Sequence, residues 1–154
     1  MKITDWVVKK QSEVLKRFSK GENILIGEYD DDIYYANKEA TVLIRIPKML
    51  WLLNTDRARN DGAELGVNII KRNIGVEIDF RAAKKDSIAY NREKELAVFT
   101  NDKCVVYVDT KLLKEFPKDA QFFTSSPVSA VRVYYENAFI GIVLPTRFVK
   151  EETV

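Results

Sequence analysis

The chain has 154 residues, 46% of them hydrophobic and 31% charged, and its formal net charge is +2 at pH 7. These values are typical of one folded domain that buries about two thirds of its unfolded surface, and they exclude a disordered chain. The sequence contains no histidine, which excludes Ser-His and Cys-His nucleophile pairs and the usual histidine zinc sites.

Residues 3–19 are predicted to form an amphipathic helix, with Thr4 or Asp5 as its N-terminal cap and Gly21 as its end. Apolar residues recur at spacings of three and four along one face. The opposite face is basic with one acid in it: Lys9, Glu13, Lys16 and Lys20 form a row, and Lys10 and Arg17 flank it. Such a face is either only solvated or a surface for phosphate groups, and the sequence leaves both interpretations open.

Residues 23–47 are predicted to form a hairpin, with one strand at 23–29 and one long or two shorter strands at 33–47. The acidic run 30–32 lies between them. Its carboxylates suit magnesium or calcium, but a calcium-binding loop needs alternating acids with glycine and glutamate at fixed positions, and these acids are consecutive. We therefore favour a solvated turn over a metal site, and we expect no cofactor.

The middle of the chain, residues 49–86, gives the weakest signals. The apolar cluster at 49–53 is interpreted as core in preference to a contact surface, and no glycine pattern of a phosphate-binding loop is present. Alternation of apolar and polar residues predicts strands at 76–80, 87–90 and 96–100. The last two are expected to form a hairpin, followed by a strand that carries the single cysteine, Cys104, as a buried side chain.

Local signals agree best over the last third of the chain. A strand at 105–109 leads into a helix at 110–116, which Asp109 caps and Pro117 stops. Lys111 and Lys114 point away from the apolar face of this helix. Three further strands are predicted, at residues 120–123, 130–135 and 138–144.

The closing sequence resembles the C-terminal end of the bacterial DNA sliding clamp, the β subunit of the replicative polymerase. The matching residues are Ile142, Val143, Leu144, Pro145, Arg147 and Phe148, with the Pro127 turn before them. The resemblance covers roughly the last quarter of the chain, and a weaker one extends over residues 1–47. It implies an α+β, DNA-clamp-like domain built from two helix-plus-antiparallel-sheet units, with helices on one face and sheets on the other. The units span approximately 1–50 and 100–150, with a variable middle segment.

The resemblance also implies a function. A clamp-like protein is a non-enzymatic processivity or scaffold factor in DNA replication that binds the duplex backbone without sequence specificity. The implied DNA-binding residues are Lys9, Lys10, Lys16, Arg17, Lys20, Lys111 and Lys114. A bacterial clamp chain has three such domains and this chain has the length of one, so a ring would be a homo-oligomer. The single-domain size suggests a protein encoded by a phage or mobile element.

In sliding clamps the C-terminal tail helps to line a hydrophobic pocket for a short linear motif of a partner protein. The matching positions are Leu144, Pro145, Thr146 and Arg147. The structural alternative is that Leu144 ends an edge strand, which Pro145 protects from pairing with another chain. If the tail is functional and the helix lysines are dispensable, the protein is a clamp mimic that binds a polymerase, clamp loader or host clamp without DNA.

An enzyme is a third interpretation, but the sequence shows no catalytic cluster of carboxylates at convincing spacing. No apolar run approaches the roughly 20 residues that span a bilayer, and the N-terminus leads into a charged amphipathic segment. We therefore expect a cytoplasmic protein without a membrane partner.

Overall fold

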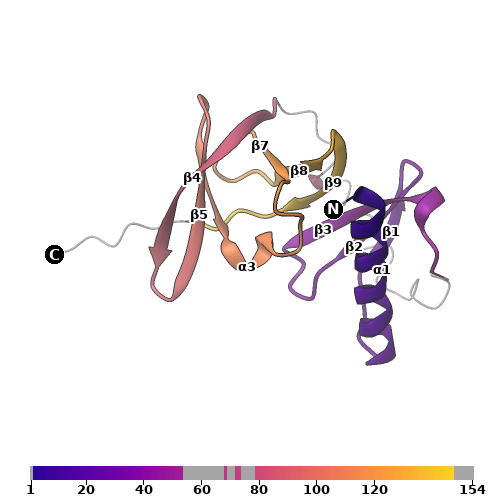
Figure 1. Cartoon of the computed structure of the whole chain (residues 1–154). Helices are drawn as coiled ribbons and strands as arrows, with labels where there is room; N and C mark the ends of the chain where they lie inside the picture. Colours follow the sequence, from indigo (N-terminus) through magenta and orange to yellow (C-terminus); the bar gives the residue numbers. More distant parts are fainter. Residues whose placement is uncertain (1, 54–67, 69–71, 74–78, 148–154) are drawn as a thin grey trace.

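The computed structural model describes residues 2–53, 68, 72–73 and 79–147. Figure 1 shows the arrangement of its elements. In chain order these are α1 (Ile3–Ser19), β1 (Ile26–Tyr29), β2 (Asp32–Ala36), β3 (Val42–Pro47), the 3-10 turn η1 (Lys48–Leu50), β4 (Arg81–Asn91), β5 (Lys94–Thr100), β6 (Val105–Asp109), α3 (Thr110–Leu113), β7 (Gln121–Thr124), β8 (Val131–Tyr135) and β9 (Ala138–Val143). Most of the strand predicted at 76–80 lies outside the described residues.

The strands of the described part form one nine-stranded sheet in the order β1-β2-β3-β9-β8-β7-β4-β5-β6. All of its neighbouring strands are antiparallel. The prediction of a mixed fold with helices and antiparallel strands is therefore confirmed. The first three strands and the last three meet where β3 pairs with β9, so the two expected units share a single sheet. Among the described residues, no helix has the length and apolar character needed to cross a membrane.

Helix α1 has the predicted bounds because its apolar stripe buries Trp6, Val7 and Val14 against the sheet. Its predicted N-terminal cap is wrong: Lys2 occupies that position and makes no side-chain capping bond. The predicted end is confirmed. Gly21 has a φ of 75°, and its amide donates to the Phe18 carbonyl at 2.9 Å. This left-handed residue closes the helix in a Schellman arrangement.

The acidic run forms a tight turn, as predicted. Asp30 and Asp31 have φ values of 49° and 61°, which is the geometry of a two-residue hairpin turn between β1 and β2. The third acid, Asp32, belongs to β2 and accepts a hydrogen bond from Arg45 Nε at 2.7 Å. Asn37 stabilises the turn between β2 and β3. Its side-chain oxygen accepts hydrogen bonds from the amides of Thr41 and Val42 at the start of β3.

The β3–β9 junction packs at Gly141 against the segment that follows α3. Its register partner in β3 is Ile44, and a Cβ on Gly141 would collide with the Leu43 carbonyl oxygen and lie 3.0 Å from the Phe116 ring. Phe116 in turn stacks on Trp6 of α1, with ring centroids 6.4 Å apart. The missing side chain of Gly141 therefore allows the strands, α1 and the segment after α3 to pack around one point.

Gly141→Ala is expected to lower the free energy of unfolding by about 2–4 kcal/mol, because the added methyl group must push β9 away from β3 or displace Phe116. Urea denaturation measures the loss. Gly21→Ala is the matched control: its Cβ would meet no atom, so only the left-handed backbone is strained, at about 1 kcal/mol. Equal losses in the two variants would contradict the close approach at Gly141.

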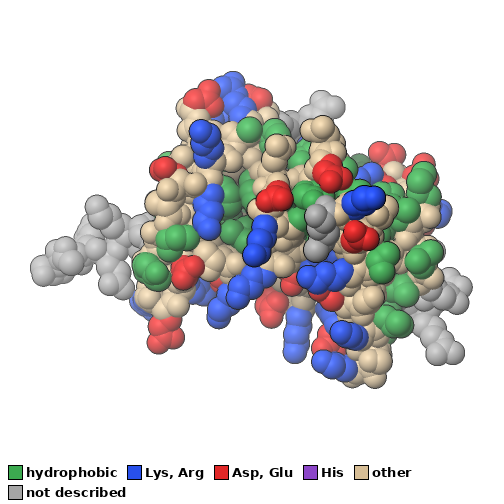
Figure 2. Space-filling model, viewed as in Figure 1, with side chains coloured by type: hydrophobic (Ala, Val, Ile, Leu, Met, Phe, Trp, Pro, Cys, Tyr) green, Lys and Arg blue, Asp and Glu red, His purple; other side chains and the backbone are tan. Residues whose placement is uncertain are grey.

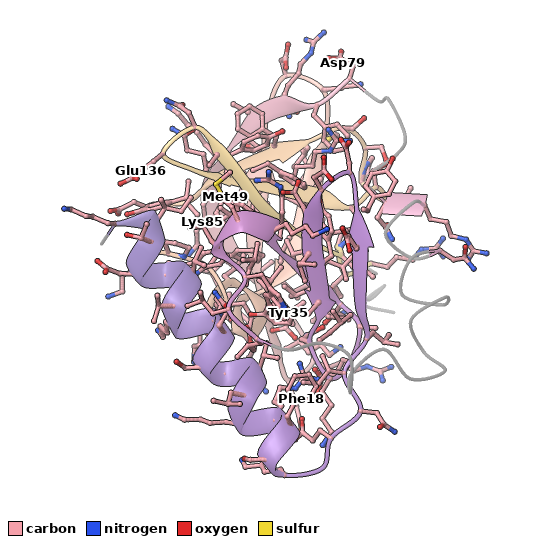
Figure 3. All side chains as sticks on the ribbon, turned by 90° about the vertical axis from the view of Figure 1, so that its right-hand side faces the viewer. Phe18, Tyr35, Met49, Asp79, Lys85 and Glu136 are labelled. Atoms are coloured by element: carbon pink, nitrogen blue, oxygen red, sulfur yellow. The ribbon has the colours of Figure 1, made fainter. Side chains whose placement is uncertain are left out.

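Two buried tyrosines of β2 predict a loss of stability at high pH. Burial raises the pKa of Tyr34 to about 12, and burial beneath α1 raises the pKa of Tyr35 further. Figure 3 shows Tyr35 between α1 and the strands, and its hydroxyl donates to the Lys10 carbonyl at 3.4 Å. The unfolded chain loses these protons near pH 10 and the folded chain retains them, so stability is complete below about pH 10 and falls above it.

Urea denaturation at about pH 9 and about pH 11 tests this dependence. The wild-type protein is expected to lose up to about 1.4 kcal/mol per pH unit for each buried tyrosine. Tyr34→Phe removes one of these groups and should lose correspondingly less over the same range. An identical loss in both proteins would show that Tyr34 does not contribute.

Candidate nucleic-acid interface

The structure brings the predicted DNA-binding residues of α1 and α3 to one side of the sheet. Lys10 Nζ of α1 donates to Glu115 Oε2 at 2.8 Å, and Trp6 Nε1 donates to the Glu115 carbonyl at 3.3 Å. Glu115 lies in the turn that follows α3, so these bonds fasten the two helices to each other. Helices that are far apart in the sequence therefore contribute to a common surface (Figure 1).

Helix α3 is shorter than predicted. The cap is confirmed, because Asp109 Oδ1 accepts a hydrogen bond from the Lys111 amide at 3.0 Å. The helix itself ends at Leu113, and the chain continues in tighter turns in which Glu115 and Phe116 donate to Leu112 and Leu113. This early end directs the Phe116 ring toward the core and leaves Lys111 and Lys114 exposed.

Lys10 does not belong to the exposed basic surface, contrary to the sequence-based expectation. Its side chain is only 3% exposed, and Nζ bonds Glu13 Oε2 at 3.1 Å as well as Glu115. The ammonium group also lies 5.9 Å from the centre of the Trp6 ring. A buried lysine that is held by two carboxylates cannot reach a phosphate group without breaking both ion pairs.

Arg17 is also engaged within the protein. Its Nε binds Glu22 Oε2 at 2.9 Å, and its Nη1 donates to the Ala36 carbonyl at 2.8 Å. The hydrogen bond from Arg17 lowers the pKa of the Glu22 carboxyl group. The Arg17 side chain is only 20% exposed, so Arg17 ties the end of α1 to β2 instead of extending into solvent.

The remaining predicted residues form what we call the basic face: Lys9, Lys16, Lys20, Lys111 and Lys114. All are exposed, and none makes an ion pair within the described part of the chain. Figure 2 shows many Lys and Arg side chains across this side of the molecule, with fewer Asp and Glu side chains among them. The nearby acids Glu13, Glu115 and Glu22 are held by Lys10 and Arg17. Two internal cations therefore offset most of the charge of these three acids, and the five exposed lysines give the surface its net positive charge.

The predicted partner-binding tail lies beside the basic face. Leu144, Pro145 and Thr146 line a hollow of about 720 Å³ that Lys111 and Leu112 also line, whereas Arg147 is exposed outside it. Backbone bonds hold the tail in place. The Leu144 amide donates to the Thr41 carbonyl and the Thr146 amide donates to the Tyr107 carbonyl, both at 2.8 Å.

The lining of this hollow is mostly charged and polar, which differs from the apolar pocket implied by the resemblance. It includes lysines that the sequence did not single out, Lys38 after β2 and Lys94 at the start of β5. Neither lies on a helix with a recognisable basic face, and only the folded sheet brings them near α1. Comparisons with protein-family models, curated proteins and solved structures found no match for this chain.

Two adjacent lysines provide a test of the assigned roles. Lys10→Met is expected to lower the free energy of unfolding by about 1–3 kcal/mol, because Glu13 and Glu115 lose the cation that joins the helices. Lys9→Met removes an exposed charge and should change stability by no more than about 0.5 kcal/mol. Thermal and urea denaturation measure both. Equal stability of the two variants would contradict the buried ion-pair network.

Proposed function

We propose that this protein is a non-enzymatic, sliding-clamp-like factor that binds the backbone of duplex DNA without sequence specificity and supports processivity or acts as a scaffold in DNA replication. The observation that carries the proposal is the basic face. Its lysines come from two helices far apart in the sequence, they are exposed, and they have no carboxylate partner in the described part of the chain.

The side-chain chemistry supports backbone binding over base readout. Lysine is a flexible point charge that attracts phosphate. Lysine also contacts guanine edges, but the planar, fixed geometry of bidentate readout is supplied by arginine, asparagine and glutamine. The candidates for such readout on α1 are already bonded. Gln11 Nε2 donates to the Leu50 carbonyl and its Oε1 accepts from the Leu52 amide, and Arg17 binds Glu22. The exposed lysines therefore favour contacts that are independent of sequence.

We also propose that the domain has a clamp-like arrangement of two helix-and-sheet halves. The two halves of the chain meet side by side through β3 and β9, and each places a helix on the same side of the sheet. Because the chain has the length of one clamp domain, encirclement of DNA requires several copies that associate head to tail. A monomer would instead bind one side of the duplex.

The salt dependence of DNA binding tests the proposal. Fluorescence anisotropy with a duplex of about 20 base pairs is expected to give a log-log slope of about −0.9 per phosphate contacted. Changing Lys9, Lys16, Lys20, Lys111 or Lys114 singly to glutamine should make the slope less negative by up to about 0.9. Lys10→Gln is the matched control. It removes a buried lysine that contacts no phosphate group, so the slope should stay the same, although the freed carboxylates of Glu13 and Glu115 should weaken binding at every salt concentration.

Two duplexes of unrelated sequence should bind with the same affinity at each salt concentration. Three outcomes would reject the basic face as a DNA-binding surface: a slope near zero, affinity confined to one DNA sequence, or an equal change of the slope in Lys9→Gln and Lys10→Gln.

A second candidate is the clamp mimic that binds a replication protein through the tail. The hollow lined by Leu144, Pro145 and Thr146 favours it, because these residues stand at its wall in a fixed backbone conformation. The candidate differs from the first in its prediction for the variants above: loss of the basic-face lysines would leave function in replication intact, whereas changes at the tail would abolish it.

A further inference from the structure

We propose that the outer edge of β4 is a docking site at which an extended acidic peptide of a partner protein adds as a further strand. The proposal concerns a surface distinct from the tail hollow. Its groove shares Lys9 and Lys114 with the basic face, but pairing of a strand with β4 does not require that the basic face binds DNA. It follows from an open strand edge, a groove beside that edge, and the charge around the groove.

Strand β4 divides its pairing between two neighbours. Residues 81–83 pair with β7, while from Lys84 to Asn91 the strand pairs with β5 on its other side. Beyond Ala83, the edge that faced β7 has no strand partner in the described part of the chain. Every residue of this stretch is exposed or half-buried. The edge therefore offers a row of backbone donors and acceptors, which is the template for strand addition.

A groove of about 1000 Å³ lies beside this fork. Apolar side chains from α1, the α3 segment and the sheet line it, including Trp6, Phe99, Leu113, Phe116 and Phe122. On β4 it reaches Ala83 and Lys85. A peptide that pairs with β4 would therefore place alternate side chains over an apolar surface.

The register of the β4–β5 hairpin extends this apolar surface. Directly opposed residues of an antiparallel pair share a face, and Phe99 and Glu95, which line the groove, oppose Lys85 and Tyr90. Ile88 opposes Ala97 on the same face. Ile88 and Tyr90 are 40% and 68% exposed, so an exposed apolar strip continues from the groove along β4.

The charge around the groove favours an acidic occupant. Lys9, Lys85, Lys114 and Lys118 line it, are exposed, and make no ion pair within the described residues. They outnumber Glu95 and Asp119, the groove acids other than the paired Glu115. Figure 2 shows the cationic side chains continuing along the β4–β5 arm on the left of the view.

Other occupants fit this edge less well. Nucleic acid has no peptide backbone to pair with a strand, and the apolar floor would desolvate phosphate groups at a cost. A second copy of this chain would bring its own Lys84 and Lys85 to an edge that already carries these two lysines, and the added positive charge disfavours self-pairing. An extended peptide with alternating acidic and apolar residues satisfies the backbone, the strip and the charge together.

The test uses the full chain and a fluorescent peptide of about twelve residues that alternates Asp or Glu with Val or Ile, with an analogue in which lysine replaces the acids. Anisotropy should show binding of the acidic peptide only. Lys85→Glu and Tyr90→Ser should each weaken it by at least about tenfold. The matched controls Lys38→Glu and Val128→Ser change exposed side chains outside the groove and should leave it unchanged.

Hydrogen exchange identifies the mode of binding. The bound peptide should protect amides of residues 84–91 and leave those of β6, the strand at the other end of this part of the sheet, unaffected. Tyr90→Ser should leave the salt slope for duplex DNA unchanged, so failure of the two proposals is distinguishable. No binding of the acidic peptide, equal binding of the lysine analogue, equal loss in the controls, or protection confined to β6 would overturn the docking site.

Discussion

The close approach of β3 and β9 at Gly141 is the contact on which the rest of the structure depends. It joins the first three strands to the strands of the C-terminal half and makes one sheet of both. The Phe116 ring fills the space above Gly141, and Trp6 stacks on that ring. Because this arrangement fixes α1 and the α3 segment over the same part of the sheet, their lysines form one surface.

The cations of that surface divide into a set that is paired within the protein and a set that is exposed. Lys10 and Arg17 hold the acids Glu13, Glu115 and Glu22, and the exposed lysines remain without partners in the described part of the chain. A formal net charge of +2 therefore says little about nucleic-acid binding. The same exposed lysines continue to the groove beside β4, so two anionic partners of different chemistry could be recognised by neighbouring parts of the molecule.

Local patterns predicted most of the elements. The bounds of α1 follow from its apolar spacing, and Gly21, Asp109 and the Asp30–Asp31 turn follow from residue types with few alternative conformations. The sequence could not show that Glu115 would reach Lys10, because the two residues are 105 positions apart and nothing in helical spacing encodes the contact. For the same reason the β3–β9 pairing and the fork in β4 had no local signal: both depend on which distant strands meet.

The most direct test of DNA binding by the basic face is to map the contact surface by NMR, using isotopically labelled protein and an unlabelled DNA duplex of arbitrary sequence. We expect fast-exchange shift changes concentrated at the basic-face residues Lys9, Lys16, Lys20, Lys111 and Lys114, and these changes should disappear as salt is raised. Changes confined to the tail at Leu144, or no changes at low salt, would contradict this expectation and would favour a protein that binds a replication partner without touching DNA.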